Sequence, residues 1–187
     1  MASANAHKAN EIAEILSGHE IEPRPHDLGE IIENEKTLEG NARLKAVAVC
    51  NQTGSPAVAD DTGLEVDALG GLPGVRSARF AGESATDVEN LLKLLDEMRE
   101  VPDGERTARF RTVALVVFPD GHEILAHGVV EGAITSSPSG SGGFGYDSVF
   151  APDEGKGLTF AEMEAEAKNF ISHRGRAFRS LAKLLED

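Results

Sequence analysis

A run of alternating apolar and polar residues from Arg106 to Phe118 is the feature that most restricts how this chain can fold. Alternation with a period of two is typical of a β-strand that turns one face to a core. The turn-forming sequence Pro119-Asp-Gly121 follows, and a second strand is predicted from about His122 to Ile134. We therefore expect a long β-hairpin, around which the rest of the chain builds a sheet.

Helices are expected before and after this hairpin. Apolar residues recur at helical spacing in several segments, and one of them opens with the capping-box sequence Thr86-Asp-Val-Glu89. The predicted helices are residues 6–16, 37–50 and 86–98, and a last helix that begins after a Ser172 cap. Helices combined with a long hairpin indicate an α/β fold.

The composition indicates one globular domain that covers residues 1–187. With 18 basic and 32 acidic side chains the formal net charge is −14, which disfavours binding to a nucleic-acid polymer. Because Cys50 is the only cysteine, an internal disulfide is impossible, and a cytoplasmic location is expected. Apolar stretches such as residues 113–118 are far shorter than the ~20 residues that cross a bilayer, and no leader opens the chain, so no membrane partner is expected.

The first candidate for chemistry is the polar segment Ser3-Ala-Asn-Ala-His-Lys8, which leads directly into a predicted helix. A helix N-terminus carries unpaired N–H groups and a partial positive charge, so a hydroxyl, an amide and an ammonium beside it would complete a cradle for a phosphate. An ordinary N-cap next to a solvated lysine explains the same residues. This segment alone does not decide between the two interpretations.

Acidic residues form the second candidate. Pro56-Ala-Val-Ala-Asp60 is predicted to be a short buried strand that delivers Asp60 and Asp61 to a turn at Thr62-Gly63, and Glu33 precedes the second predicted helix. Hard carboxylate oxygens suit Mg²⁺, which is usually shared between one or two carboxylates, waters and substrate phosphates. A carboxylate beside such a metal can take a proton from an attacking water. Solvated surface acids are the alternative, and the apolar strand before the two aspartates argues against it.

The glycine-rich loop of residues 136–147 and the start of the last helix supply two more candidates. Gly140-Ser-Gly-Gly-Phe-Gly145 matches the dinucleotide-binding pattern only formally, because a hairpin precedes it and a strand-like segment follows. Phe144 is instead a plate on which a base can stack, or a core anchor of its loop. Lys168 and Ser172-His-Arg174 offer hydrogen-bond donors that suit a keto oxygen or a phosphate, although, taken alone, a helix cap explains them better.

Taken together and in this order, these segments strongly resemble the inosine triphosphate pyrophosphatase family, the Ham1/RdgB-type dITP/XTP pyrophosphatases. The resemblance covers essentially the whole chain, and several of its blocks are long and specific. The matching blocks are residues 3–8, Thr37-Leu-Glu-Gly-Asn-Ala-Arg-Leu-Lys-Ala46, Ala59-Asp-Asp-Thr-Gly-Leu-Glu-Val-Asp-Ala-Leu-Gly-Gly-Leu-Pro-Gly74, Ser77-Ala-Arg-Phe-Ala-Gly82, Gly142-Gly-Phe-Gly-Tyr-Asp147 and residues 168–177.

This resemblance implies a Mg²⁺-dependent homodimer that hydrolyses the deaminated purine nucleotides ITP, dITP and XTP to the monophosphate and pyrophosphate, and so cleanses the nucleotide pool. It implies an α/β fold with a long mixed β-sheet flanked by helices, and two lobes with a central active-site cleft. A donor-lined pocket agrees with these substrates, because it would accept a 6-keto oxygen and leave unpaired donors against the amine of adenine.

The resemblance also implies a role for individual residues. Asp61 is similar to the family's proton acceptor, and Glu33 and Asp61 are similar to its magnesium ligands. We expect a water to attack the α-phosphorus with Asp61 as base, while Mg²⁺ and Lys8 neutralise the triphosphate. The implied substrate-binding residues are Ser3, Ala4, Asn5, Ala6, His7, Lys8, Thr62, Phe144, Gly145, Tyr146, Asp147, Lys168, His173 and Arg174.

The chain departs from the family pattern in a few places. Only Met1 and Ala2 precede Ser3, where the family has a full hydrophobic strand, so we expect a shortened first strand or a start that lies upstream. Ser3-Ala4 stands where Thr-Gly is usual, and Ser148 where a proline is frequent.

Two other functions stay open. One is a pyrophosphatase for other modified nucleotides, such as methylated pyrimidine triphosphates. The other is a nucleotide-binding regulator without turnover, against which the presence of Lys8, Glu33 and Asp61 argues.

Overall fold

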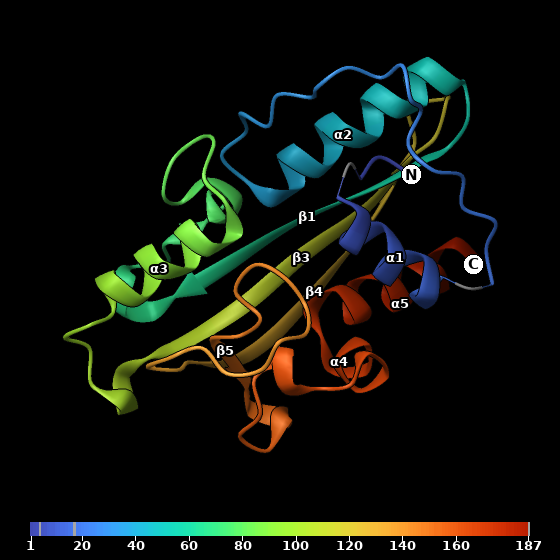
Figure 1. The fold of residues 1–187 in the computed structure, drawn as a ribbon. Helices are drawn as coiled ribbons and strands as arrows, with labels where there is room; N and C mark the ends of the chain where they lie inside the picture. Colours follow the sequence, from blue (N-terminus) through green and yellow to red (C-terminus); the bar gives the residue numbers. More distant parts are fainter. Residues whose placement is uncertain (4, 17, 187) are drawn as a thin grey trace. The chain divides into compact units, whose positions relative to one another are not determined.

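The computed structural model describes residues 1–3, 5–16 and 18–186 (Figure 1). Ala4 and the side chain of Ala6, both assigned above to the phosphate-binding segment, lie outside the described part. The chain divides into two compact units, which we describe one at a time. The first unit is Met1–Thr62, Thr112–Gly128 and Ser172–Asp187, and the second is Gly63–Arg111 and Val129–Ile171.

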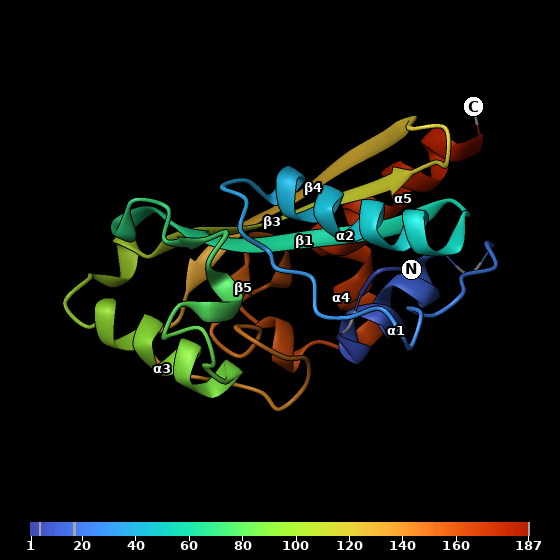
Figure 2. The same ribbon diagram turned by 90° about the horizontal axis from the view of Figure 1, so that it is seen from above.

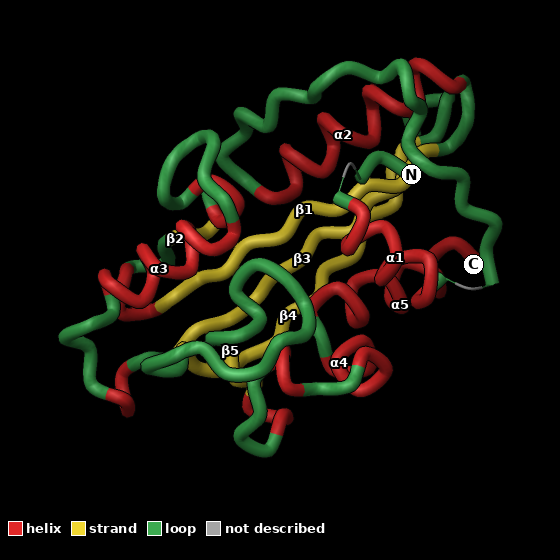
Figure 3. The backbone as a smooth tube through the Cα atoms, in the orientation of Figure 1, coloured by secondary structure: helices red, strands yellow, loops and turns green. Residues whose placement is uncertain are grey.

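Five strands form one sheet in the order β2-β1-β3-β4-β5 (Figure 3). The edge strands β2 and β5 pair antiparallel with β1 and β4. β3 and β4 form the predicted hairpin, at whose end the N–H of Phe118 donates to the carbonyl of His122 at 2.9 Å. The predicted α/β fold, with a long sheet flanked by helices, is confirmed. The strands are β1 (Ala57–Val66), β2 (Pro73–Gly74), β3 (Thr107–Val117), β4 (Glu123–Ile134) and β5 (Phe150–Pro152).

Strand β1 is longer than the sequence pattern predicted. It continues to Val66, so the predicted turn at Thr62-Gly63 is wrong. The strand continues because Leu64 and Val66 are fully buried in the core of the second unit. Asp60 and Asp61 therefore lie within a strand and not at its end, and their side chains point to opposite faces of the sheet.

Helices cover both faces of the sheet in the first unit. α1 (Ala6–Ile15) and α5 (His173–Glu186) pack against each other on one face (Figure 1). Val113 and Leu115 alternate to the other face, where they are also buried, and α2 (Leu38–Thr53) lies there (Figure 2). The core between α1, α5 and the strands consists of Ile12, Leu16, Ala114, Val116, Ala126, Ala177, Phe178 and Leu181.

The second unit buries only one face of its part of the sheet. α3 (Asp87–Glu97), which opens with the predicted capping box of Thr86 and Glu89, packs on that face. The opposite face carries charges, because Arg109 forms ion pairs with Glu65 and with carboxylates on neighbouring segments. The core consists of Leu64, Val66, Leu91, Leu94, Met98, Ala108, Phe110, Val130, Ile134, Tyr146, Val149, Phe150 and Phe160.

The remaining elements are short. α4 (Ala165–Ile171) was not predicted, and α2 runs three residues past its predicted end, to a left-handed cap at Gly54. The described residues 1–3 form no strand, but Ala2 is buried and its N–H donates to the carbonyl of Val58 in β1 at 2.8 Å. The 3₁₀ turns are η1 (Asp67–Leu69), η2 (Ser77–Arg79), η3 (Asp103–Glu105), η4 (Asp153–Gly155) and η5 (Phe160–Glu162). None of the helices in the described part of the chain has the length and apolar character that a membrane span requires.

Candidate active site

Asp60 is the centre of an ion-pair network on the α1 and α5 side of β1. Its side chain is 2% exposed, and its carboxylate lies 3.4 Å from the Nζ of Lys8 and 3.4 Å from the Nε of Arg174. The hydroxyl of Thr62 also donates to it at 3.2 Å. Burial works to raise the pKa of Asp60, but the charges of Lys8, Arg174 and Lys45 hold that pKa well below its usual range. Asp60 therefore stays ionised and holds the cations around it.

Arg174 is almost completely buried at the start of α5. It forms ion pairs with Asp60 and with Glu11 of α1, and it donates to the hydroxyl of Thr62 at 3.3 Å. The predicted N-cap of this helix is confirmed, because the N–H of Gly175 donates to the hydroxyl of Ser172 at 3.0 Å. The neighbouring His173 is buried as well. In these bonds Arg174 donates to two carboxylates and one hydroxyl, all from the first unit.

Glycine at position 128 allows this close packing. A Cβ added to Gly128 in β4 would lie 2.0 Å from the carbonyl oxygen of His173. The backbone of α5 can therefore approach the sheet at His173 only where the strand has no side chain.

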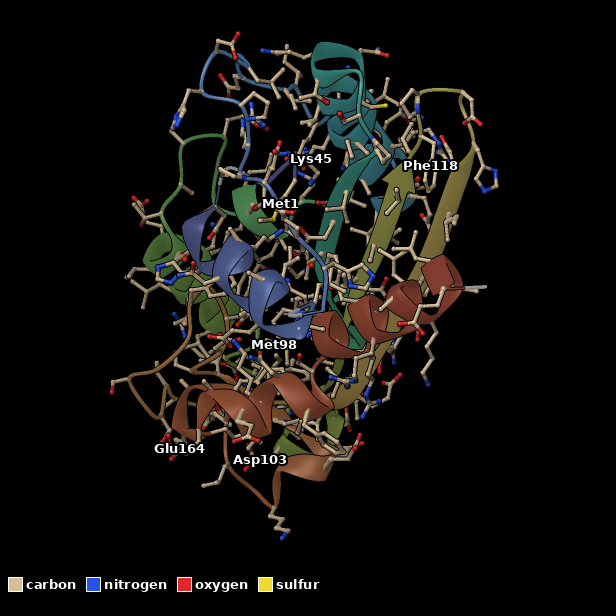
Figure 4. All side chains as sticks on the ribbon, turned by 90° about the vertical axis from the view of Figure 1, so that its right-hand side faces the viewer. Met1, Lys45, Met98, Asp103, Phe118 and Glu164 are labelled. Carbon is tan, nitrogen blue, oxygen red and sulfur yellow. The ribbon has the colours of Figure 1, made fainter. Side chains whose placement is uncertain are left out.

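Asp61 points to the other face of β1, toward α2. The ammonium of Lys45 lies 2.9 Å from its carboxylate and 3.2 Å from that of Glu33, so one cation bridges two carboxylates (Figure 4 labels Lys45). The amide of Asn41, one helical turn before Lys45, donates to Asp61 at 3.3 Å. Lys45 and Asp61 are buried, and the side chain of Glu33 is 34% exposed.

The two neighbouring aspartates differ in pKa. Burial raises the pKa of Asp61 above its usual value, and the nearby Lys45 and Lys8 offset this only in part. For Lys45, burial works to lower the pKa, but the charges of Asp61, Asp60 and Glu33 together raise it, so its ammonium is charged at neutral pH. A pair of carboxylates whose environments drive their pKa values apart is a pattern found where one group transfers a proton and the other stays charged.

Glu33 and Asp61 have the chemistry of a divalent-metal site. Their oxygens already share one cation, the ammonium of Lys45, and hard oxygen ligands are those that Mg²⁺ prefers. Across residues 1–3, 5–16 and 18–186, no group of three or more His, Cys, Asp or Glu side chains is placed to hold a metal ion. Because Mg²⁺ normally keeps waters and substrate phosphates among its ligands, two carboxylates are sufficient for the protein's part. The carboxylates of Glu33 and Asp61 therefore fit a bound Mg²⁺.

The predicted phosphate-binding segment begins α1. Asn5 is the N-cap, and its side-chain oxygen accepts from the N–H groups of His7 and Lys8 at 2.9 and 3.2 Å. The hydroxyl of Ser3 is 3.3 Å from the backbone of Asn5. An N-cap at Asn5 agrees with both interpretations of this segment, but Lys8 is not the solvated lysine of the second one, because its side chain is 20% exposed and pairs with Asp60.

In the second unit, the glycine-rich loop surrounds a buried ion pair. The ammonium of Lys168 lies 2.8 Å from the carboxylate of Asp147, and both side chains are less than a tenth exposed. The same carboxylate accepts from the N–H of Phe144 at 2.9 Å. Lys168 also lies over the half-buried ring of Phe144, 5.2 Å from its centroid, which is a cation–π distance. Asp147 and Lys168 thus hold Phe144 and its loop in place.

Tyr146 anchors the same loop from within the core. Its side chain is buried, and its hydroxyl donates to the carbonyl of Ser77 at 2.8 Å. Burial, with a smaller contribution from Asp87, raises the pKa of Tyr146 far above its usual value. The N–H of the adjacent Gly145 donates to Asp87 at 3.0 Å. These contacts show that Tyr146 and Gly145 help to fix the loop. Their contact with a substrate stays a prediction.

Sequence reasoning missed three residues of the first-unit network: Asn41, Lys45 and Glu11. For Asn41 and Lys45 a signal was present, because these polar residues lie four apart on the side of the predicted helix that also carries Ala42, Ala46 and Val49. A polar pair within a buried apolar stripe needs partners, and these could have been sought among the acidic residues. Glu11 had no such signal, since its partner Arg174 is 163 residues away.

The predicted residues thus form groups within each unit. Lys8, Thr62 and Arg174 gather around Asp60, and Glu33 joins Asp61 through Lys45. Phe144, Asp147 and Lys168 form the group in the second unit. That all of them act on one substrate stays a prediction.

Comparison with known proteins gives matches over nearly the full chain. The Ham1 family profile matches residues 1–184. A dITP/XTP pyrophosphatase of Geobacter sulfurreducens is 49% identical over 186 residues, which span 97% of this chain and 92% of that protein. The solved structure of a HAM1 protein from Coxiella burnetii has a TM-score of 0.89 and 39% identity, and covers 99% of this chain and 96% of its own. The Staphylococcus aureus Ham1 structure covers the same shares, with a TM-score of 0.87 and 35% identity.

Proposed function

Because the chain belongs to the Ham1 family, we propose that it is a nucleoside triphosphate pyrophosphatase that hydrolyses deaminated purine nucleotides. The proposed substrates are ITP, dITP and XTP, and the products are the nucleoside monophosphate and pyrophosphate. The observation that carries the proposal is the ammonium of Lys45 between the carboxylates of Glu33 and Asp61. Oxygen ligands that converge on one cation are what a triphosphate with its divalent metal requires.

In the proposed reaction a water attacks the α-phosphorus and gives its proton to the carboxylate of Asp61. The bond between the α-phosphorus and the bridging oxygen breaks, and pyrophosphate leaves with the electron pair of that bond. In the absence of metal, burial raises the pKa of Asp61, which makes its carboxylate a better proton acceptor than an exposed aspartate. Lys8 and Lys45 neutralise the negative charge that the phosphates carry in the transition state.

Asp60 has a different part in this mechanism. It stays ionised, and its ion pairs with Lys8 and Arg174 hold both cations in place without taking part in proton transfer. We propose that Glu33 and Asp61 hold Mg²⁺, which when bound offsets negative charge on the triphosphate. Lys8 and Lys45, together with the charge that a bound metal would offset, would supply by electrostatic stabilisation much of the rate beyond the ~10²–10⁴ of general-base help.

For the nucleoside we propose stacking on Phe144 and hydrogen bonds to the 6-keto oxygen from the donors Lys168, His173 and Arg174. The cation–π contact of Lys168 with Phe144 supports this, because a ring held by a charged neighbour is a ready surface for a base. A 6-amino group would face donors that it cannot pair with, and a buried unpaired donor costs about 1–3 kcal/mol. Adenine nucleotides should therefore be poor substrates.

The proposal is tested by pyrophosphate release from ITP, XTP, dITP, GTP and ATP with Mg²⁺. The wild type is compared with Asp61→Asn and with a matched control, Asp103→Asn, at an exposed aspartate of η3. Pyrophosphate release from the deaminated purine nucleotides alone would support the proposed substrate class. Its loss in Asp61→Asn, with release kept in the control, would support Asp61 as the general base. Release mainly from modified pyrimidine triphosphates would overturn the substrate class, and tight ITP binding without release would indicate a regulator.

We also propose that residues 1–187 act as one catalytic domain, as a homodimer in the cytoplasm. Size-exclusion chromatography with light scattering tests the dimer. A mass of twice the 19.8 kDa of one chain is expected, and a mass of 19.8 kDa at micromolar concentration would contradict it.

A further inference from the structure

The 3₁₀ turn η5 (Phe160–Glu162) holds the glycine-rich loop of the second unit through side-chain hydrogen bonds. The hydroxyl of Thr159, the N-cap of the turn, donates to the carbonyl of Ser139 at 2.8 Å. In return, the hydroxyl of Ser139 donates to the carboxylate of Glu162 at 2.6 Å. Thr159 is 1% exposed, so its bond is formed away from water. These reciprocal bonds join the turn to the beginning of the loop.

Backbone contacts join the turn to the rest of the loop. The N–H of Gly142 donates to the carbonyl of Ala161 at 3.0 Å, and the N–H of Ala161 donates to the carbonyl of Asp147 at 3.2 Å. Gly140, in the left-handed region at φ +82°, lies so close that an added Cβ would be 2.4 Å from the carbonyl carbon of Ala161. The turn therefore touches the loop at its start, its middle and its end.

Glu162 connects the two sets of bonds. Its carboxylate accepts from Ser139 and, as the last residue of a capping box, from the N–H of Thr159 at 2.8 Å. The hydrogen bond from Ser139 and that from the Thr159 backbone lower the pKa of Glu162, although its side chain is exposed. Glu162 thus holds the loop only while the turn itself is folded.

We propose that Thr159 and Glu162 are positioning residues that hold the loop of Phe144 and Asp147 in the shape that binds the nucleoside. The inference rests on the proposed function, since it assigns the loop to the nucleoside. A loop with several glycines loses much conformational entropy when it becomes ordered. When the turn has already ordered the loop, binding does not have to supply that free energy, and affinity rises.

The test is Thr159→Val, which keeps the shape of the side chain and removes its donor. Loss of the hydrogen bond to Ser139, together with the capping-box contact between the hydroxyl and Glu162, should raise the Kd for inosine monophosphate and the KM for ITP at least about fivefold. kcat should stay within about twofold of the wild-type value, because the residue touches no reacting atom. The matched control is Thr107→Val, which removes a threonine hydroxyl that donates to Asp67 elsewhere in the second unit, and it should leave Kd and KM unchanged.

A spectroscopic readout tests the loop without any ligand. Tyr146 is the only tyrosine and the chain has no tryptophan, so tyrosine fluorescence comes from this loop alone. Acrylamide should quench this fluorescence more strongly in Thr159→Val than in the wild type, and equally in Thr107→Val and the wild type. Ser139→Ala, which removes the exposed bond to Glu162, should act in the same direction and serves if Thr159→Val does not fold.

Unchanged quenching and unchanged Kd in both loop variants would overturn the inference. So would a fall in kcat with KM unchanged, because that pattern places the effect in the chemical step. A wild-type protein that neither binds inosine monophosphate nor hydrolyses ITP would contradict the proposed function instead. Quenching in Thr159→Val would still report in that case whether the turn holds the loop.

Discussion

Replacing Asp60 by Asn should destabilise the protein by about 3–5 kcal/mol, the usual cost of breaking a buried ion pair by removing one partner. The magnitude follows from the geometry, because the carboxylate is 2% exposed and lies 3.4 Å from both Lys8 and Arg174. At an effective dielectric constant of about 20, each of these pairs has a gross attraction of about 5 kcal/mol. Desolvation offsets much of this attraction in the wild type, but Asp60→Asn leaves the buried Arg174 with one carboxylate fewer and recovers little solvation.

Urea denaturation at pH 7, followed by far-UV circular dichroism, measures this loss. In a separate thermal unfolding experiment the melting temperature should fall by roughly 10 °C, since about 1 kcal/mol corresponds to 2–4 °C in a chain of this size. Because the pKa of Asp60 is lowered on folding, its contribution is present at neutral pH and is lost as the pH falls below about 4, the pKa of an unfolded aspartate. The difference between the wild type and Asp60→Asn should therefore narrow in acid.

Asp103→Asn, at an exposed aspartate, is the control and should unfold like the wild type. A loss under about 1 kcal/mol for Asp60→Asn at pH 7 would refute the argument, because exposed ion pairs have that magnitude. A difference that stays constant from pH 7 to pH 3 would show that the ionised carboxylate is not its source.

Three further predictions follow from single sites. The pKa of the Asp61 carboxyl should lie above the usual aspartate value in the protein without Mg²⁺, because burial raises it. An NMR titration of that carboxyl in the absence of metal measures this, and a pKa below about 4 would contradict it. Gly128→Ala should lower the free energy of unfolding, measured in urea, by about 1–3 kcal/mol or more, because the added Cβ would lie 2.0 Å from the carbonyl oxygen of His173. An unchanged free energy of unfolding would show that α5 does not pack so closely on β4. Arg106→Met should lower the free energy of unfolding by about 3 kcal/mol, because the buried guanidinium donates to four backbone carbonyls. Arg106→Lys should recover only part of this loss, since an ammonium cannot reach all four acceptors as the planar guanidinium does. Equal stabilities of the two variants in calorimetry would contradict this.

Local patterns predicted most of the fold. The hairpin of β3 and β4, the start of α1 after its N-cap Asn5, the capping box of Thr86 and Glu89, and the cap at Ser172 all depend on residues a few positions apart. Such elements follow from propensity, periodicity and side-chain reach, which a single sequence displays. The prediction of a turn at Thr62-Gly63 was wrong. β1 continues because Leu64 and Val66 are buried among residues from other parts of the chain, which a local sequence pattern does not display.

The sequence by itself determined which residue types were available for the site: adjacent aspartates, a lysine at a helix start, and a glycine-rich loop with an aromatic residue. Only the tertiary structure decided what each of them does. Asp60 and Asp61 are identical and adjacent, yet the pKa of one is lowered and that of the other is raised. The reason is the alternation of a strand, which turns Asp60 to Lys8 and Arg174 and turns Asp61 to the buried side of α2, where Lys45 is shared with Glu33.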